Sequence, residues 1–214
     1  MLFSKKQYYS YVPIKTSFDS LNEYIKTNDS LLTYVHEQNP LNESELKNFT
    51  IERHIFKCPI KYRKHMKIIM GRAKGVYVFL GARLNSEGQF ARIETYVGGS
   101  FADAYRRISD YYQESYLLAQ DRNVTDFILE VGIENLIIIF FKIIQLDQSK
   151  RITAKAASEL ELYFIQKLKP SLNSTRNSNL HEKYGTSRAK GVPGGFNIYF
   201  VTNITIGFFL AKLV

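Results

Sequence analysis

The sequence has 214 residues, of which 45% are hydrophobic, and a formal net charge of +9 at pH 7. A chain of this length and apolar content can bury one good core, and its charge indicates a polyanionic partner, either nucleic acid or an anionic membrane surface. The single cysteine, Cys58, excludes an internal disulfide and a cysteine-rich zinc site, and the four histidines lack the spacing of zinc ligands. A metal ion in this protein would therefore need a carboxylate ligand.

The excess positive charge lies towards the two ends of the sequence. Residues 1–74 contain 13 Lys and Arg against 7 Asp and Glu, and residues 174–214 contain 5 against 1, whereas residues 75–173 contain 11 against 12. This distribution is typical of a near-neutral catalytic module held on a phosphate backbone by basic flanks. We predict a basic N-terminal extension at 1–74, a folded domain at 75–173 and a short C-terminal tail at 174–214 that is a truncated DNA-binding region.

The N-terminal extension has two parts. Residues 1–56 have the pattern of short helical pieces in a polar context. Residues 57–74 contain seven Lys and Arg and no acid, and the interleaved Tyr62 and Ile68 favour a strip that contacts DNA over a solvated linker. The residues predicted to contact double-stranded DNA are Lys57, Lys61, Arg63, Lys64, Lys67, Arg72 and Lys74.

The next 100 residues show regular periodicity. Residues 75–80 and 90–98 are rich in β-formers and are separated by a turn-prone stretch, which predicts a hairpin. Helical spacing follows over 101–119 and 124–131. The continuous apolar run 136–144 predicts a buried strand. With one more helix these elements form an α+β domain, a small three-stranded mixed or antiparallel sheet flanked by helices.

That last helix is predicted over 152–169, where Pro170 stops it. Glu161 lies on the border of its apolar face, whereas Glu159 is about 160° away from that face on a helical projection. The sequence therefore predicts that Glu161 points inward and Glu159 outward.

The final stretch of the tail, 196–214, is strongly apolar. Asn197, Asn203 and Lys212 interrupt it, so the sequence favours a soluble packed segment and no membrane partner. The absence of Trp, together with many Tyr, Phe, Ile, Lys and Asn residues, is typical of an AT-rich coding sequence and fits an organelle genome.

Four motifs within 75–173 resemble those of the GIY-YIG nucleases. Residues 75–77 (GVY) resemble the GIY element and residues 96–98 (YVG) the YIG element. Residues 105–112 (YRRISDYY) resemble the RRLxxYY stretch, and 161–173 (ELYFIQKLKPSLN) resembles the ExxxIDxLKPxYN run of fungal intron-encoded members. One such tripeptide occurs by chance, but four in the right order are a specific signal.

The resemblance implies a GIY-YIG nuclease fold and a DNA endonuclease that cleaves phosphodiester bonds with one divalent cation, Mg²⁺ or Mn²⁺, and no small-molecule cofactor. It favours an intron-encoded homing endonuclease that acts on double-stranded DNA in the mitochondrion. Two other interpretations stay open: a repair-type or restriction-type GIY-YIG nuclease, and a catalytically inactive nucleic-acid-binding remnant of an intron-encoded protein. A membrane-associated product is a weaker third.

The resemblance also implies the roles of single residues. Glu161 would hold the cation, Tyr77 would activate or position the attacking water, and Tyr96 would orient the site. Asn173 would maintain the geometry on the metal side. Tyr111 stands where family members carry His or Tyr.

An arginine would hold the phosphate, and two are adjacent. Spacing from Tyr96 selects Arg106, whereas alignment of RRIxxYY with the family pattern selects Arg107 and requires one inserted residue after Gly98. We prefer Arg107, because an insertion in a loop costs less than a rotated helix. Tyr111, four residues later, would then share its helix face.

Overall fold

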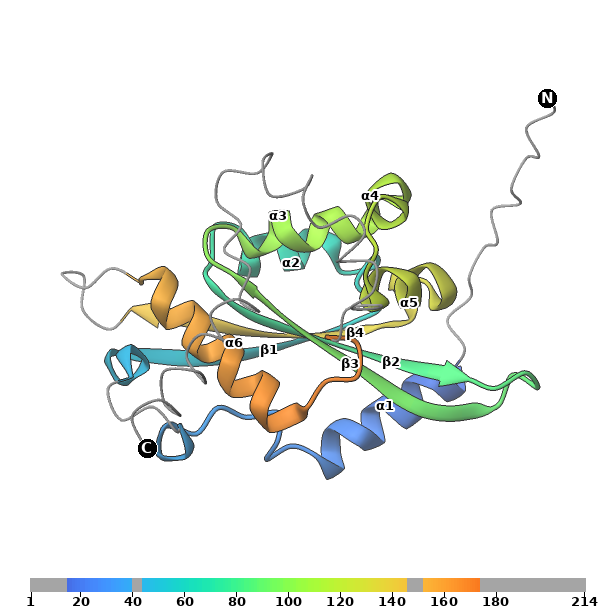
Figure 1. The fold of residues 1–214 in the computed structure, drawn as a ribbon, viewed down its shortest axis with the longest axis horizontal. Coiled ribbons are helices and arrows are strands. Elements are labelled where there is room, and N and C mark those ends of the chain that lie inside the picture. Colours follow the sequence, from blue (N-terminus) through green and yellow to red (C-terminus); the bar gives the residue numbers. More distant parts are fainter. Residues whose placement is uncertain (1–14, 40–43, 146–151, 174–214) are drawn as a thin grey trace, which may run out of the picture. The chain divides into compact units, whose positions relative to one another are not determined.

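The computed structural model describes residues 15–39, 44–145 and 152–173, with side chains from residue 18 onward (Figure 1). These residues belong to one compact unit that spans Met1–Thr175. The predicted tail at 174–214, including its apolar stretch, lies outside the described residues. Within the described part of the chain, no helix is both long and apolar enough to cross a membrane.

The described residues form an α+β fold built on one antiparallel sheet. Its strands are β1 (Phe49–Lys57), β2 (Gly75–Leu84), β3 (Phe90–Ser100) and β4 (Ile137–Gln145), in the spatial order β1-β4-β2-β3. The helices are α1 (Lys15–Thr27), α2 (Arg63–Met70), α3 (Ala104–Ser109), α4 (Glu114–Leu118), α5 (Asn123–Val131) and α6 (Ala154–Leu168), with short 3₁₀ turns at η1 (His36–Gln38), η2 (Glu45–Asn48), η3 (Asp110–Tyr112) and η4 (Ile133–Asn135). The predicted α+β class is thus confirmed, but the sheet has a fourth strand.

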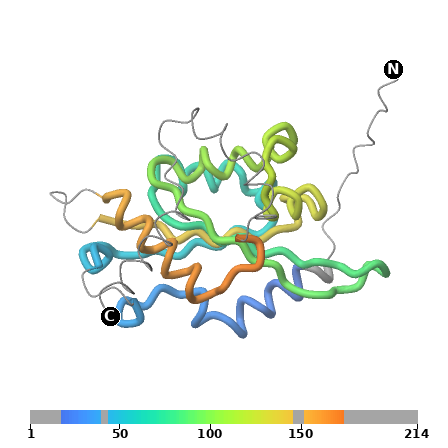
Figure 2. The backbone as a smooth tube through the Cα atoms, in the orientation of Figure 1, coloured from blue at the N-terminus to red at the C-terminus, as the bar shows by residue number. Residues whose placement is uncertain are grey.

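Strand alternation divides the core into two layers. Val76, Val78 and Leu80 of β2 pack on the face covered by α1 and α6, whereas Tyr77 and Phe79 point to the face covered by α2 to α5. Figures 1 and 2 show these two groups of helices on opposite sides of the sheet. Because β4 is covered on both faces, residues 137–141 are all buried, which explains their uninterrupted apolar run.

Several predicted elements are confirmed. The hairpin is formed by β2 and β3, and Asn85 caps its turn by accepting hydrogen bonds from the backbone N–H groups of Glu87 and Gln89. The helices predicted at 124–131 and 152–169 appear as α5 and α6, and the strand predicted at 136–144 appears as β4.

The prediction for residues 49–57 was wrong. They lie in the part of the extension predicted to be helical, yet they form β1 and pair with β4 along all nine residues. The long-range register, Phe49 with Gln145 through Lys57 with Ile137, supplies hydrogen bonds that no local pattern reveals.

The single helix predicted at 101–119 was also wrong. Asp103 caps α3 by accepting from the backbone N–H of Arg106, but the helix stops at Ser109 and gives way to η3 and α4. This break lets Tyr111 turn fully into the core, where it is 0% exposed.

Because β1 completes the sheet, we predict that a fragment limited to residues 75–173 will not fold cooperatively, whereas a fragment of residues 1–175 will. The shorter fragment leaves one edge of the apolar strand β4 unpaired and removes Leu21, Leu32 and Leu46 from the core. Thermal unfolding followed by circular dichroism checks this. A sharp, reversible transition in the shorter fragment would show that β1 is dispensable.

Candidate active site

Three tyrosines predicted to be functional gather on the α2-to-α5 face of the sheet. The ring centroids of Tyr77 and Tyr96 are 6.2 Å apart, and each lies 6.4 Å from that of Tyr111. The Tyr111 hydroxyl donates to the Tyr96 hydroxyl at 3.4 Å. Tyr77 comes from β2, Tyr96 from β3 and Tyr111 from η3, so the fold brings together residues that are up to 34 positions apart.

Arg107, and not Arg106, points into this tyrosine cluster. Its Nη1 donates to the hydroxyl of Tyr116 at 3.3 Å, and its side chain is half-buried, whereas Arg106 is exposed. Burial disfavours the charge, but the pKa of Arg107 is raised because Tyr77, Tyr111, Tyr116 and Tyr96 lie close to it. Arg107 therefore keeps its charge beside the cluster.

Burial also sets the direction in which the pKa values of the tyrosines shift. It raises the pKa of Tyr77 well above 10, with further contributions from Tyr111 and Tyr96, and Arg107 offsets only part of the increase. Burial and Tyr111 likewise raise the pKa of Tyr96, and the charge of Glu161 adds to this. Both hydroxyls are therefore protonated at neutral pH, which suits hydrogen-bond donors and not a general base.

Glu161 approaches the same part of β3 from the other face of the sheet. It belongs to α6, is 8% exposed and packs against Gly99. A Cβ atom at position 99 would lie 2.5 Å from Glu161 Oε2, so only glycine leaves space for this carboxylate. The inward orientation predicted for Glu161 is confirmed.

The preceding glycine makes room for a tyrosine in the same way. A Cβ atom at Gly98 would lie 2.6 Å from the Tyr77 hydroxyl and ring. Consecutive residues of a strand face opposite sides, so Gly98 accommodates Tyr77 on one face and Gly99 accommodates Glu161 on the other. Gly75 allows close packing as well, because a Cβ there would meet the Phe141 carbonyl oxygen at 2.1 Å.

The Glu161 carboxylate is buried, and one of its oxygens could accept a further bond. Its Oε2 atom has no hydrogen-bond partner of good geometry within the described residues. Burial raises the pKa of Glu161 to about 7, against the opposing effects of the Gly99 backbone amide and the Arg107 charge. A buried oxygen without a partner and an easily displaced proton are properties of a carboxylate that can accept a cation.

Glu161 could hold a divalent cation if water and substrate supplied further ligands. Among residues 15–39, 44–145 and 152–173 no group of three His, Cys, Asp or Glu side chains could hold a metal ion. Of the described side chains, Glu161 would be the ligand, and water and substrate oxygens would supply further ones. Mg²⁺ and Mn²⁺ accept such an oxygen-rich and largely hydrated shell.

Asn173 lies at the outer edge of β3 and completes a short segment that we call the β3 clamp, Ser171 to Asn173. The Asn173 side chain accepts a hydrogen bond from the Val97 N–H and donates one to the Val97 carbonyl, both at 2.8 Å. Leu172 N–H donates to the Thr95 carbonyl at 3.0 Å. The structure thus places Asn173 on the backbone beside Tyr96, where it holds the strand.

Glu159 is not outward-facing, and that prediction was wrong. It is 7% exposed, and its Oε2 accepts hydrogen bonds at 2.9 Å from the Ser44 hydroxyl and from the Glu45 backbone N–H. Ser44 and Glu45 precede β1 and cover the side of α6 that the helical projection left open. Glu159 therefore binds α6 to the N-terminal segment.

The predicted DNA-contacting residues mostly lie on one exposed surface. Lys61, Arg63, Lys64 and Lys67 lie on or next to α2, which is a helix packed on the sheet through Met66 and Met70 and not a linker. Lys57 and Arg72 are exposed at its two sides. Lys74 differs, because it is half-buried and its Nζ donates to the Ile152 carbonyl.

Arg63 joins this basic surface to the tyrosine side of the molecule. Its Nε donates to the Tyr105 hydroxyl at 3.1 Å, and its guanidinium lies 4.9 Å from the ring centroid of Tyr112. Both tyrosines belong to the α3 and η3 segment that carries Arg107. The basic helix and the candidate active site are therefore parts of one packed layer.

Two residues at the site were not among those predicted from the sequence. Tyr116 accepts the hydrogen bond from Arg107; it lay within the helix predicted at 101–119 but stands in none of the four motifs. Arg122, exposed at the start of α5, lowers the pKa of Tyr116 and of Tyr96 by its charge, although burial raises both. Arg122 lies outside the four motifs, so nothing in the sequence was a reason to select it.

No protein-family model, no curated protein and no solved structure matched the chain.

Gly98→Ala should reduce the free energy of unfolding by about 1–3 kcal/mol, because the added methyl overlaps the buried Tyr77 ring. Urea unfolding measures the loss. The loss should shrink in a Tyr77→Leu background, where the overlapping ring atoms are absent. An equal loss in both backgrounds would mean that Gly98 is needed for another reason.

Glu161 should make the metal-free protein less stable as pH rises. The pKa of its carboxyl is raised from 4.5 to about 7 in the folded state, so the stabilisation is complete below pH 4.5 and is lost as pH rises through about 7. At most about 3 kcal/mol is involved. Urea unfolding in EDTA at pH 5 and pH 8 should show a smaller pH-dependent loss in Glu161→Gln than in the wild type, and identical losses would contradict the assignment.

Proposed function

We propose that this protein is a metal-dependent DNA endonuclease of the GIY-YIG type and that residues 75–173 supply the nuclease motifs, within a fold that β1 and the N-terminal segment complete. The observation that carries the proposal is the cluster of Tyr77, Tyr96, Tyr111 and Arg107 on one face of the sheet, where Tyr77 packs against Gly98, together with Glu161, which packs against Gly99 on the other face and has an Oε2 atom without a hydrogen-bond partner among the described residues. Each of these residues stands in a motif that resembles the family.

Arg107 would bind the scissile phosphate. Its guanidinium is permanently charged, half-buried and surrounded by hydroxyl groups, which strengthens its interaction with an anion relative to an exposed side chain. A planar donor that forms two hydrogen bonds suits the extra negative charge that develops on the phosphoryl oxygens during hydrolysis. Arg107 is thus the residue for transition-state stabilisation.

Glu161 would hold Mg²⁺ or Mn²⁺. A cation bound there would supply charge neutralisation at the phosphate and lower the pKa of a water molecule. The protein's contribution is the close packing of Glu161 against Gly99, which leaves its buried Oε2 atom without a hydrogen-bond partner among the described residues. The charge of Arg107 lowers the pKa of Glu161, and we propose that the two groups act on the same phosphate from the two faces of the sheet.

Tyr77 and Tyr96 would position water and phosphate by donating hydrogen bonds. Their raised pKa values oppose ionisation, so we assign neither the role of a base in the free protein. Tyr111 supports them, because its hydroxyl donates to Tyr96 and its ring packs edge-on against Tyr77.

Double-stranded DNA is the proposed substrate. The exposed basic residues of α2 and its flanks, Lys57, Lys61, Arg63, Lys64, Lys67 and Arg72, would bind the phosphate backbone next to the site. With the sequence run at 161–173, this favours intron homing in a mitochondrion. A protein that binds DNA but does not cut it is the alternative, and cleavage assays separate the two.

Two matched substitutions test the assignment in a plasmid-cleavage assay with Mg²⁺. Arg107→Ala should reduce the single-turnover rate at saturating DNA by roughly 100-fold or more, as expected for loss of a transition-state donor. Arg106→Ala, one residue away and exposed, should change it little.

Glu161→Gln should abolish cleavage while DNA affinity, which comes mainly from the basic surface, persists. Glu130→Gln is the control for removal of one negative charge, because Glu130 lies half-exposed on α5. Greater loss in Arg106→Ala than in Arg107→Ala, or full activity in Glu161→Gln, would overturn the proposed site. DNA binding by an inactive wild type would favour the alternative.

A further inference from the structure

We propose that Glu94 and Ser171 are positioning residues, which lock the β3 clamp and thereby hold Glu161 of α6 in place against β3. This inference rests on the proposed function for its effect on catalysis. The lock itself is a feature of the described structure.

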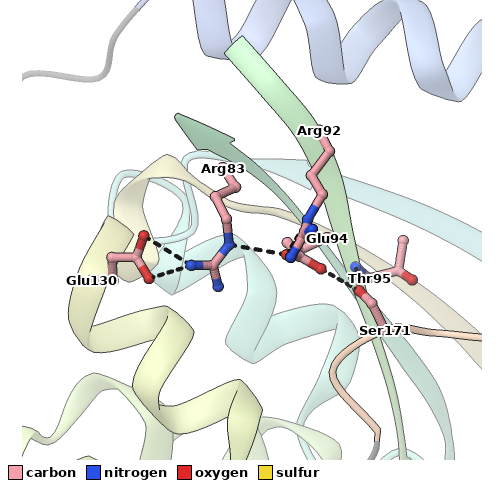
Figure 3. Close-up of polar contacts among 6 residues, drawn as sticks. All are labelled: Arg83, Arg92, Glu94, Thr95, Glu130 and Ser171. Atoms are coloured by element: carbon pink, nitrogen blue, oxygen red, sulfur yellow. Dashed lines mark hydrogen bonds and ion pairs between the residues drawn. The ribbon is translucent and has the colours of Figure 1, made fainter. Parts of the chain in front are cut away.

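Glu94 is a buried carboxylate with an unusual number of partners. It is 2% exposed, and its Oε1 accepts hydrogen bonds from Arg83 Nε at 2.9 Å and Arg92 Nε at 2.8 Å (Figure 3). Its Oε2 accepts a hydrogen bond from the Ser171 hydroxyl. Burial opposes its ionisation, but these hydrogen bonds from Ser171, Arg92 and Arg83 lower the pKa of Glu94, so it is charged at neutral pH.

Ser171 connects Glu94 to the rest of the β3 clamp. Its hydroxyl also accepts a hydrogen bond from the Thr95 N–H at 3.3 Å, and Leu172 and Asn173 then bond to the Thr95 and Val97 backbones. The clamp therefore follows the outer edge of β3 on both sides of Tyr96. Only the single turn at Lys169 and Pro170 separates it from α6, which ends at Leu168.

This connection explains how α6 is held relative to β3. Glu161 faces Gly99 from one side, and the clamp bonds to Thr95 and Val97 of the same strand. If the clamp opened, the segment that follows α6 would lose its hydrogen bonds to β3, and Glu161 could move relative to Tyr96. A misplacement of about 1 Å in an active site can cost about 100-fold in rate.

Arg83 extends the network and provides a matched control. Its Nη1 bonds to Glu130 on α5 at 2.8 Å and 3.2 Å, on the side of Glu94 away from the clamp (Figure 3). Loss of Glu130 removes one ion pair of this network but leaves the bond between Glu94 and Ser171. If this network only stabilised the fold, loss of a bond at Glu130 and loss of a bond at Ser171 would have similar effects.

The test compares Ser171→Ala, Ser171→Thr and Glu130→Gln in the full chain, with two readouts. The first is amide hydrogen exchange at Val97, whose N–H donates to Asn173. In Ser171→Ala this amide should exchange about tenfold faster, whereas Ser171→Thr, which keeps a hydroxyl, and Glu130→Gln should behave like the wild type.

The second readout is single-turnover DNA cleavage. Ser171→Ala should lower the rate at saturating DNA about 10- to 100-fold with little change in Kd, and Ser171→Thr should restore it. Unchanged exchange at Val97 in Ser171→Ala would overturn the lock. Faster exchange with an unchanged cleavage rate would overturn the positioning role. If the wild type does not cleave DNA, the proposed function fails, and exchange at Val97 still decides whether Ser171 locks the clamp.

Discussion

The contact between the Glu161 carboxylate and Gly99 is the one on which the candidate site depends. A buried carboxylate oxygen without a hydrogen-bond partner costs free energy, and Oε2 of Glu161 is such an oxygen among the described residues, held against Gly99 by the packing of α6 on β3. The neighbouring Gly98 lets Tyr77 approach the opposite face of the same strand. Two glycines at the end of an edge strand thus allow chemically different groups on the two faces of a sheet to act on one small region.

Arg107 and Glu161 differ in the charge that they bring to this region. Arg107 carries a fixed positive charge among tyrosine hydroxyls that burial keeps protonated, and Glu161 carries a proton that it can release near neutral pH. An anion is attracted to the arginine, and a cation can replace the proton of the carboxyl. A phosphodiester with a divalent ion satisfies both requirements together, which is why we propose hydrolysis of DNA as the reaction.

The sequence predicted those parts of the fold whose signals are local. The hairpin of β2 and β3, the strand β4 and the helix α6 have clear periodicity, and the inward position of Glu161 followed from that of α6. Errors arose where distant segments decide: β1 is a strand because β4 lies beside it, and Glu159 is buried because Ser44 and Glu45 cover its side of α6. The preference for Arg107 over Arg106 came from the motif alignment, and the structure places Arg107 beside the tyrosines and Arg106 in solvent. Glu94 stood in no motif, and Ser171 stood at a variable position of the run 161–173, so their bond could not be foreseen.

The most direct test of this account is the incubation of the full-length protein with a library of random-sequence duplex DNA, with Mg²⁺ in one arm and EDTA in the other. The account predicts cleavage only with Mg²⁺, which Mn²⁺ can replace, at a restricted set of sequences and with 5′-phosphate and 3′-hydroxyl ends. No cleavage in either arm, under conditions where the protein is folded and binds the DNA, would contradict it. Cleavage that persists in EDTA would contradict the role proposed for Glu161.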